Sequence, residues 1–242
     1  MLDYRPEDPN KIEAFVCRSK YLNICQYPEE LDYQNSVSIA DEFVRVDSFI
    51  RNDTQTFELP KEFSAASKNN KLIYVSLGSM GSVDVNLMKR IVSVLATTPY
   101  YYIVSKGPLG DEYSLPRNCW GENYLPQTQI LPLVDLVITH GGNNTTTESF
   151  SFGKPMIVMP LFGDQYDNAQ RIHETGYGIR LETYGFKDEE LIQAVDQLLN
   201  DADLDMKLDK AKHRIQLSNS KEQCCIKIEQ IVEKFQKEKL SN

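Results

Sequence analysis

The sequence has little positive charge and little histidine. Its 242 residues include 26 Lys and Arg against 35 Asp and Glu, and three His, which gives a formal net charge of −9. Affinity for the phosphate backbone of nucleic acids requires clustered Lys and Arg, so we expect no nucleic-acid partner. An anionic ligand must therefore be held locally, by backbone N–H groups and helix N-termini.

Long apolar runs and cysteine motifs are also missing. No segment approaches the ~18 apolar residues of a membrane helix, and the first residues, MLDYRPEDPNK, contain neither the basic nor the apolar region of a signal peptide. The five cysteines form no Cys-x-x-Cys pair and leave one over if the others pair: Cys17, Cys25, Cys119, Cys224 and Cys225. We therefore expect no membrane span, free thiols and a cytoplasmic location.

What is present is an alternation of strands and helices from Lys71 onward. The apolar, β-prone runs KLIYVSL, YYIVSK, LVITH, MIVMP and GIRLE follow one another, and helical patterns separate the later runs. Strands that alternate with helices form right-handed parallel βαβ units. The sequence therefore predicts an α/β fold with a Rossmann-like parallel sheet.

The two ends of the chain differ from this pattern. Residues 1–60 lack the alternation and contain two strand-like pieces, YLNICQY and EFVRVDSFI, and residues 57–70 are typical of a connection into a new domain. The last residues form a helical pattern with an apolar stripe. We therefore divide the chain into 1–60, 61–218 and 219–242, and we expect the C-terminal helix to pack back on the fold.

Polar residues gather where the predicted strand LVIT ends. His140, Gly141 and Gly142 follow it directly, and Asn143 to Thr147 then begin a helix. A pyrophosphate at this position would meet unpaired N–H groups, the positive end of the helix dipole and a histidine proton. A capped helix with a buried His140 is the alternative, and spacing alone does not separate the two.

Glu148 has two roles open to it, which compete for its oxygens. Thr145-x-x-Glu148 has the spacing of a capping box, in which the glutamate binds the backbone one turn back. A carboxylate near a nucleotide can instead accept from both hydroxyls of a ribose. Asp164 and Gln165 pose a similar choice at the start of the next helix, because Asp is a good N-cap and the pair can also bracket the vicinal hydroxyls of a sugar.

The remaining candidates carry less information on their own. Tyr124 either stacks on a base or packs, and Ser79 either donates to a phosphate or serves a tight turn. The loop SLGSMGS around Ser79 is not G-x-G-x-x-G, which counts against a dinucleotide-dependent oxidoreductase. The aspartates Asp201, Asp203 and Asp205 resemble metal ligands, but they lie between two predicted helices, where Asp caps helix starts, so we expect no metal.

Together these pieces resemble the signature of the UDP-dependent glycosyltransferases, which glycosylate small lipophilic molecules. The resemblance covers roughly Leu72 to Leu199 and rests on Tyr124-Leu-Pro-Gln127, Thr139-His-Gly-Gly142, Glu148, Gly153-Lys-Pro155 and Asp164-Gln165. It implies the GT-B fold, two Rossmann-like domains facing across a cleft, with this chain as the C-terminal, donor-binding domain. Residues 1–60 are similar to the end of the N-terminal, acceptor-binding domain, most closely in the arthropod branch of the family.

The resemblance also implies a role for each candidate residue. Tyr124 takes the place of an aromatic residue, usually Trp, that stacks on uracil, with Leu125 and Gln127 beside the base. Glu148 holds the ribose hydroxyls. The diphosphate is held by Ser79, His140, Gly142, Asn143, Asn144 and Thr145, and the sugar hydroxyls by Asp164 and Gln165.

The implied reaction is an inverting, metal-independent transfer of a hexosyl group from a UDP-sugar to a small lipophilic hydroxylated acceptor. Gln165 favours UDP-glucose as the co-substrate, and no other cofactor is implied. The family's general base is a histidine in the N-terminal domain, and no histidine precedes His140 here. We therefore expect no catalytic residue in this chain, with the acceptor domain supplied by a longer protein or by a partner chain. The alternative is an inactive UDP-sugar-binding or regulatory module.

Overall fold

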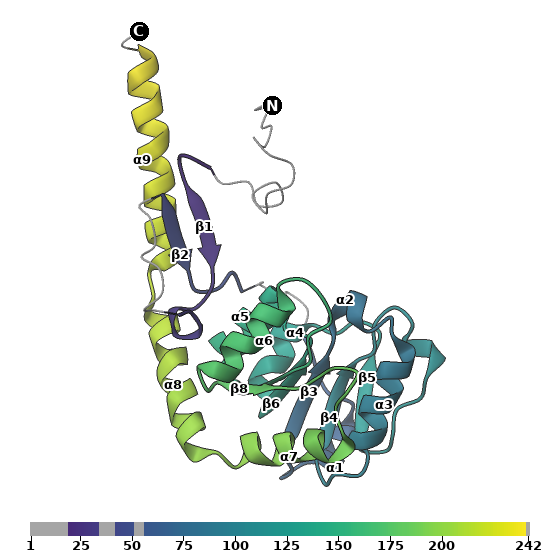
Figure 1. Cartoon of the computed structure of the whole chain (residues 1–242). Coiled ribbons are helices and arrows are strands. Elements are labelled where there is room, and N and C mark those ends of the chain that lie inside the picture. Colours follow the sequence, from purple (N-terminus) through teal and green to yellow (C-terminus); the bar gives the residue numbers. More distant parts are fainter. Residues whose placement is uncertain (1–18, 34–41, 51–55, 241–242) are drawn as a thin grey trace.

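The computed structural model describes residues 19–33, 42–50 and 56–240. They form a main domain built on a six-stranded sheet and a narrower part, in which a two-stranded sheet lies beside a long C-terminal helix (Figure 1). All four cysteines in these ranges are free thiols, and Cys17 lies outside them. None of the helices in the described part of the chain is both long and apolar enough to span a bilayer.

The main sheet is parallel throughout and confirms the predicted α/β fold. Its order is β5-β4-β3-β6-β7-β8, with every neighbouring pair parallel. The chain reverses its direction of progress across the sheet between β3 and β6, and ligands of open parallel sheets bind at such a point. The strands are β3 (Leu72–Ser76), β4 (Tyr101–Ser105), β5 (Cys119–Glu122), β6 (Leu136–Thr139), β7 (Met156–Val158) and β8 (Gly178–Arg180).

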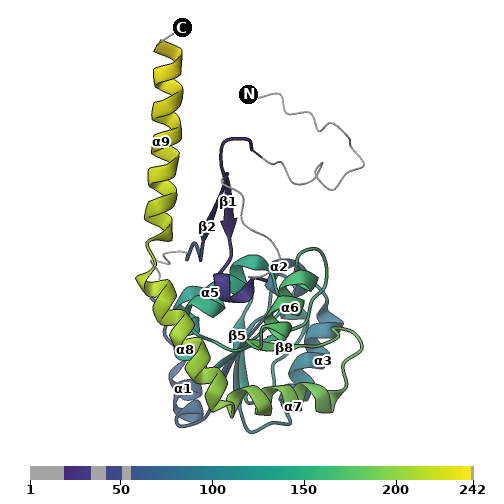
Figure 2. The same cartoon turned by 60° about the vertical axis from the view of Figure 1, so that its left-hand side comes forward.

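Helices cover both faces of this sheet. As a result, every residue of β3, β6 and β7 is buried. α3 packs against α7, and α5 packs against α6 and α8 (Figure 2). The helices are α2 (Gly78–Gly81), α3 (Val85–Leu95), α4 (Gln127–Ile130), α5 (Asn143–Ser151), α6 (Gln165–Glu174), α7 (Asp188–Leu199) and α8 (Ala202–Leu217), with 3₁₀ turns η3 (Gly110–Glu112) and η4 (Leu131–Leu133).

Two predictions about local structure are wrong. The expected connection over residues 57–70 contains a further helix, α1 (Lys61–Ser67), which forms because its Phe63 is buried against the main domain. The turn expected around Ser79 is the one-turn helix α2. Asp201, by contrast, has the capping role that its position indicates, since it accepts from the N–H of Leu204 at 2.9 Å at the start of α8.

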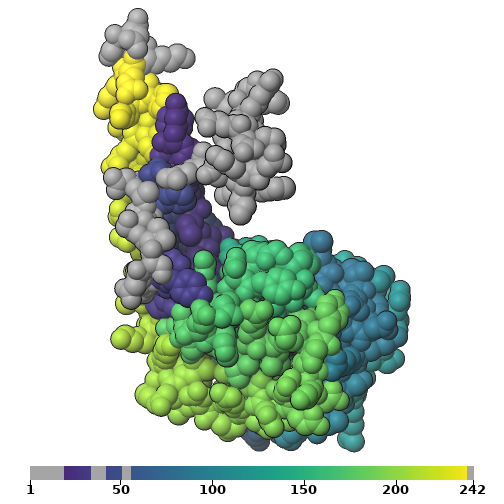
Figure 3. Space-filling model, viewed as in Figure 1, coloured from purple at the N-terminus to yellow at the C-terminus, as the bar shows by residue number. Residues whose placement is uncertain are grey.

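The narrower part consists of β1 (Asn23–Gln26), η2 (Glu29–Leu31), β2 (Phe43–Val46) and α9 (Ser220–Leu240). β1 and β2 are parallel and fall within the two strand-like pieces of the sequence. α9 contacts β2 and projects beyond the main domain, and the ring of Tyr21 meets that of Phe235 edge-on at 5.0 Å. Figure 3 shows this part as a column standing on one side of the main domain.

Candidate functional site

A pocket of about 180 Å³ opens at the carboxyl ends of β3 and β4, beside the first turn of α5. It lies at the reversal point between β3 and β6, where the fold itself favours a ligand. Five of the predicted site residues line it: Ser79, Tyr124, Leu125, Gln127 and Thr145. Its other lining residues are Tyr74, Ser76, Gly78, Ser105, Gly107 and Asn123.

His140 leaves the end of β6 and lies between two glycines. A Cβ on Gly78 would come within 2.8 Å of Nε2 of the imidazole, and a Cβ on Gly142 within 2.5 Å. Burial lowers the pKa of His140, while its hydrogen bond to the Ser76 backbone and the charge of Asp164 act in the opposite direction. The half-buried ring is therefore neutral at pH 7 and carries one N–H, which bonds the Ser76 backbone and can serve a phosphate only if it leaves that oxygen.

Helix α5 begins directly after this ring and has no side-chain cap. Its first residue is Asn143 and its N-cap is Gly142, which cannot cap with a side chain. Thr145 is thus the third residue of the helix, so the capping-box alternative for Thr145 and Glu148 does not occur. The first-turn N–H groups of α5 have no side-chain acceptor at the cap position and can serve an anion.

Glu148 lies behind Gln127 instead of lining the pocket. Its side chain is buried, with 1% exposed, and Oε2 accepts from Nε2 of Gln127 at 2.6 Å. The carboxamide oxygen of Gln127 in turn accepts from the hydroxyl of Thr145 at 3.4 Å. Gln127 is therefore held between two side chains of α5, and its own amide group faces the same pocket as Thr145.

The two asparagines at the start of α5 are placed differently. Asn144 is exposed, whereas Asn143 is half-buried and donates its side-chain amide to the backbone oxygen of Gln26 at 3.3 Å. Gln26 also donates its own amide to Oγ1 of Thr147 at 3.2 Å. Sequence reasoning did not find Gln26, because no local pattern links it to a helix more than a hundred residues away.

Asp164 and Gln165 precede and begin α6. Asp164 is exposed and does not cap the helix, so the alternative of a simple N-cap is wrong. Gln165 is buried, and its Oε1 accepts from the N–H groups of Leu161 and Phe162 at 2.9 and 3.1 Å. Because the backbone occupies its oxygen, the amide NH₂ of Gln165 is the group left to donate to a ligand.

A further contact joins the start of α6 to the loop that holds His140. Asn168 donates its side-chain amide to the backbone oxygen of Gly141 at 2.9 Å. The charge of Asp164 also acts on His140, so the two groups lie in one electrostatic environment. At the other end of the site, Tyr124 stands at the pocket rim with 69% of its surface exposed.

Comparisons with known proteins agree on the family. A sequence model described as UDP-glucoronosyl and UDP-glucosyl transferase matches residues 25–216. A sterol 3-beta-glucosyltransferase from Saccharomyces cerevisiae (strain YJM789) is 33% identical over 172 residues, which are 64% of this chain and 14% of that protein. The human UDP-glucuronosyltransferase 1A9 is 34% identical over 149 residues, 59% of this chain and 28% of that protein.

Solved structures share the fold. The glycotransferase of kitacinnamycin superimposes with a TM-score of 0.77 at 24% identity, over 87% of this chain and 55% of that chain. CalG4, the calicheamicin glycosyltransferase, gives 0.72 at 18% identity, over 93% of this chain and 57% of that one. The neighbours are GT-B glycosyltransferases, and this chain spans little more than half of each. The family match covers most of the chain, which therefore belongs to the UDP-glucuronosyl and UDP-glucosyl transferase family.

Proposed function

We propose that this chain is the donor-binding half of a UDP-glycosyltransferase. The observation that carries the proposal is one pocket, lined by Gln127 and Thr145, beside a neutral histidine and the uncapped start of α5. The donor is UDP-glucose, and the acceptor is a small lipophilic molecule with a hydroxyl group. The choice of glucose and of a lipophilic acceptor is supported by the sterol glucosyltransferase relative, and the use of a UDP-sugar by the UDP-glucuronosyltransferase relative.

The nucleoside occupies the pocket in this proposal. Uracil stacks on the exposed ring of Tyr124, with Leu125 beside it, and the ribose lies against Gln127. Glu148 accepts from Gln127 and fixes the orientation of its amide, and it reaches the ribose hydroxyls only if Gln127 moves aside. The pocket is small, and its rim at the exposed Tyr124 is open, so part of the nucleoside lies outside the enclosed volume.

The diphosphate and the sugar follow toward α5 and α6. The phosphates accept from Ser79, from the N–H of His140 and from the first-turn N–H groups of α5. The sugar hydroxyls are bracketed by Asp164, which accepts, and by the free NH₂ of Gln165, which donates. Held in this way, the donor runs along the carboxyl edge of the sheet from β5 to the start of α6.

The transfer itself is an inverting displacement. The acceptor oxygen forms a bond to the anomeric carbon while the bond from that carbon to the diphosphate oxygen breaks, and the diphosphate keeps the electron pair. Pre-placed donors stabilise the charge that develops on the diphosphate, and no metal is needed. The acceptor proton goes to a base on the acceptor half, because the other two histidines of this chain, His173 and His213, are exposed on α6 and α8.

A second candidate function is UDP-sugar binding without turnover. It is favoured by the lining of the pocket, whose residues include no His, Asp, Glu or Lys that could act as a general base. In that case the chain acts as a binding or regulatory module for a partner that carries the acceptor half.

Calorimetric titration of the purified chain tests donor binding. We expect UDP and UDP-glucose to bind and NADH not to bind. EDTA should leave the affinity for UDP unchanged, because the proposed site needs no metal. Gln127→Ala should weaken UDP binding by about 1–3 kcal/mol, since it removes from the pocket the side chain against which the ribose lies in this proposal. Gln193→Ala, at an exposed position of α7, is the matched control and should bind as the wild type does. Binding of NADH alone would contradict the proposal.

Turnover distinguishes the two candidate functions. The chain alone, given UDP-glucose and a phenolic acceptor, should release no UDP, and addition of an acceptor half from a longer relative should restore release. Glucoside formation by the chain alone would show that a base is present within it. Donor binding with no turnover in either experiment would favour the binding module.

A further inference from the structure

Helix α5 begins in the proposed donor site, yet its own sequence does little to hold that end in place. The N-cap Gly142 supplies no side chain, and the first five residues, Asn-Asn-Thr-Thr-Thr, are all poor helix formers. A helix start of this kind frays unless tertiary contacts hold it. Gln127 holds Thr145 and Glu148 from within the main domain, and further contacts come from the narrower part of the molecule.

Gln26, the last residue of β1, binds α5 at two points one turn apart. Its backbone oxygen accepts from the side-chain amide of Asn143 at 3.3 Å. Its side-chain amide donates to Oγ1 of Thr147 at 3.2 Å. Asn143 and Thr147 are four residues apart and lie on the same face of the helix, so one residue of β1 spans the whole first turn.

The contact with Thr147 continues into the helix. The Thr147 hydroxyl accepts from Gln26 and donates to the backbone oxygen of Asn144 at 3.3 Å, which uses both capacities of the hydroxyl. Hydrogen bonds in such a chain polarise and strengthen one another. The side chain of Gln26 is thereby connected to the turn of α5 that presents its N–H groups to the donor.

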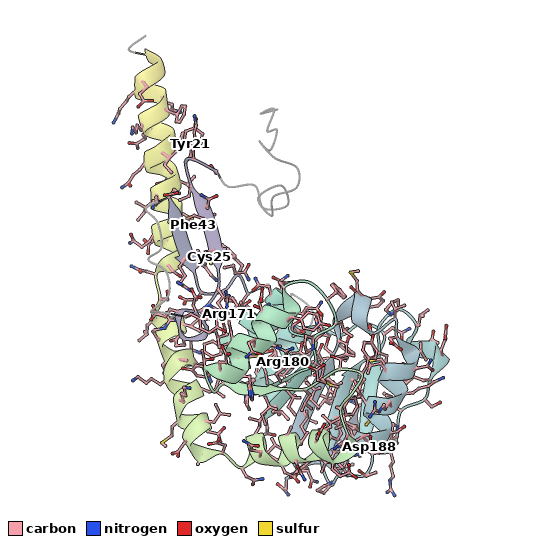
Figure 4. The ribbon with its side chains drawn as sticks, viewed as in Figure 1. Tyr21, Cys25, Phe43, Arg171, Arg180 and Asp188 are labelled. Carbon is pink, nitrogen blue, oxygen red and sulfur yellow. The ribbon has the colours of Figure 1, made fainter. Side chains whose placement is uncertain are left out.

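Gln26 is itself firmly placed. It pairs with Val46 in the parallel register of β1 and β2, and the next residue, Tyr27, donates its N–H to Val46 at 2.9 Å. The guanidinium of Arg171, on α6, lies over the Tyr27 ring at 5.2 Å. In Figure 4, Cys25 and Arg171 mark this junction, where the lower end of β1 meets α5 and α6.

We propose that Gln26 is a positioning residue for the donor site, an inference that rests on the proposed function of that site. Gln26 does not line the pocket and acts through Asn143 and Thr147 on the start of α5. The side chain of Asn143 is engaged by Gln26 and the hydroxyl of Thr145 by Gln127, so Asn144 is the first-turn side chain left for the diphosphate. Donor affinity is thus coupled to the part of the chain that adjoins the acceptor side.

Titration of the full chain with UDP tests the coupling. Gln26→Ala removes the side-chain amide and keeps the backbone oxygen that Asn143 uses. We expect the dissociation constant for UDP to rise about threefold to tenfold, the range set by loss of one net hydrogen bond. Thr147→Val should have the same effect, and the double variant should be no weaker than either single one, because both interrupt one chain of bonds.

Asp32→Asn is the matched control, because it breaks the 2.5 Å pair with Arg45 inside the narrower part and leaves the Gln26 contacts in place. It should bind UDP as the wild type does. Amide hydrogen exchange over residues 143–148, without ligand, should be faster in Gln26→Ala and unchanged in Asp32→Asn.

The outcomes separate this inference from the proposed function. Wild-type UDP affinity together with wild-type exchange in Gln26→Ala would overturn the positioning role and leave the proposed function standing. If the wild-type chain binds no UDP, the proposed function is contradicted instead. In that case the exchange experiment still tests Gln26, because unchanged exchange over residues 143–148 in Gln26→Ala would show that Gln26 does not stabilise the start of α5.

Discussion

The imidazole of His140 fits its place because two residues beside it have no side chain. The glycines act for different reasons. Gly78 has a φ of +69°, which L side chains rarely adopt, whereas Gly142 has an ordinary φ of −60° and is required only by the closeness of the ring. Gly142 is therefore a position where a methyl group changes the site without straining the backbone.

Gly142→Ala should weaken UDP binding more than it weakens the fold. The new Cβ would lie 2.5 Å from Nε2 of His140, so the ring must move away from its donor position. Loss of a hydrogen bond to a charged phosphate corresponds to roughly tenfold to hundredfold in affinity. Calorimetry with UDP and urea unfolding of the same variant measure the two effects separately.

Gly185→Ala is the control for this experiment. The nearest atom to its added Cβ is 3.7 Å away, an ordinary contact, and its φ is not in the left-handed region. It should leave both UDP affinity and stability close to those of the wild type. Wild-type UDP affinity in Gly142→Ala would show that His140 makes no contact with the diphosphate.

Helix α5 is unusual because most of its buried residues are threonine and serine, whereas buried helix positions are usually apolar. All residues from Thr145 to Ser151 are buried. Two of them, Thr146 and Ser149, have side-chain hydroxyls with no hydrogen-bond partner among the described residues. A buried hydroxyl without a partner costs about 1–3 kcal/mol, so the helix is held by its packing and its neighbours.

Ser149→Ala should stabilise the protein by up to about 1 kcal/mol. It removes an unpartnered buried hydroxyl and introduces the best helix former. Urea unfolding measures the difference. Ser151→Ala is the matched comparison, because the Ser151 hydroxyl donates to the backbone oxygen of Thr147 at 2.7 Å and its loss should not stabilise. Equal effects of the two substitutions would show that the Ser149 hydroxyl has a partner in solution.

Strands with continuous apolar runs could be predicted from the sequence, whereas β5 could not. β3 and β6 are predictable because their sequences, LIYVS and LVIT, are almost entirely apolar. Such runs are typical of parallel strands that are buried on both faces, as these two are. β5 has the sequence Cys-Trp-Gly-Glu, which carries no β-branched residue and no alternation, so it was missed. Spacing alone does not locate the start of α5, because Thr145-x-x-Glu148 fits a capping box while Gly142 holds the N-cap position.

The candidate site was predictable for a related reason. Most of its residues follow a strand directly or begin a helix, and the parallel fold brings these ends together whatever else the chain does. Gln26 and Arg214 escaped prediction, since their partners lie far away in the sequence. Arg214, on α8, binds Asp47 at 2.6 Å and Glu30 at 2.7 Å across 167 and 184 positions, and no local pattern records such pairs.

At the scale of the whole molecule, Arg214 ties the narrower part to the main domain through several carboxylates. Its guanidinium contacts Glu30 and Asp47, and Glu29 lies 3.5 Å away. Further ties are Arg171 of α6, which lies over the Tyr27 ring, and the contact of Gln26 with α5. Three helices of the donor domain, α5, α6 and α8, therefore contact the narrower part. At position 214 an arginine suits this junction better than a lysine, because its planar guanidinium can donate to two carboxylates at once.

Asp47 gives this junction a dependence on pH that can be measured. Burial alone would raise the pKa of Asp47, but hydrogen bonds from Arg214 and from Ser218 and the charge of Arg214 hold it below its usual value. A carboxyl whose pKa is lowered on folding stabilises the folded state at any pH above its pKa in the unfolded chain, which is about 3.9 for Asp. This contribution to stability is lost as the pH falls from there through the lower pKa of the folded state.

Unfolding by urea at pH 7 and at pH 3 should therefore show a smaller acid-induced loss of stability in Asp47→Asn than in the wild type. At pH 7 the same variant should be less stable by about 1–3 kcal/mol, because Arg214 keeps only part of its network. Asp203→Asn, at an exposed position in the first turn of α8, should follow the wild type at both pH values. Parallel acid losses in Asp47→Asn and the wild type would mean that Asp47 titrates alike in the folded and unfolded chains. The tie between α8 and the narrower part would then depend on Glu30, in η2, and not on this buried carboxylate.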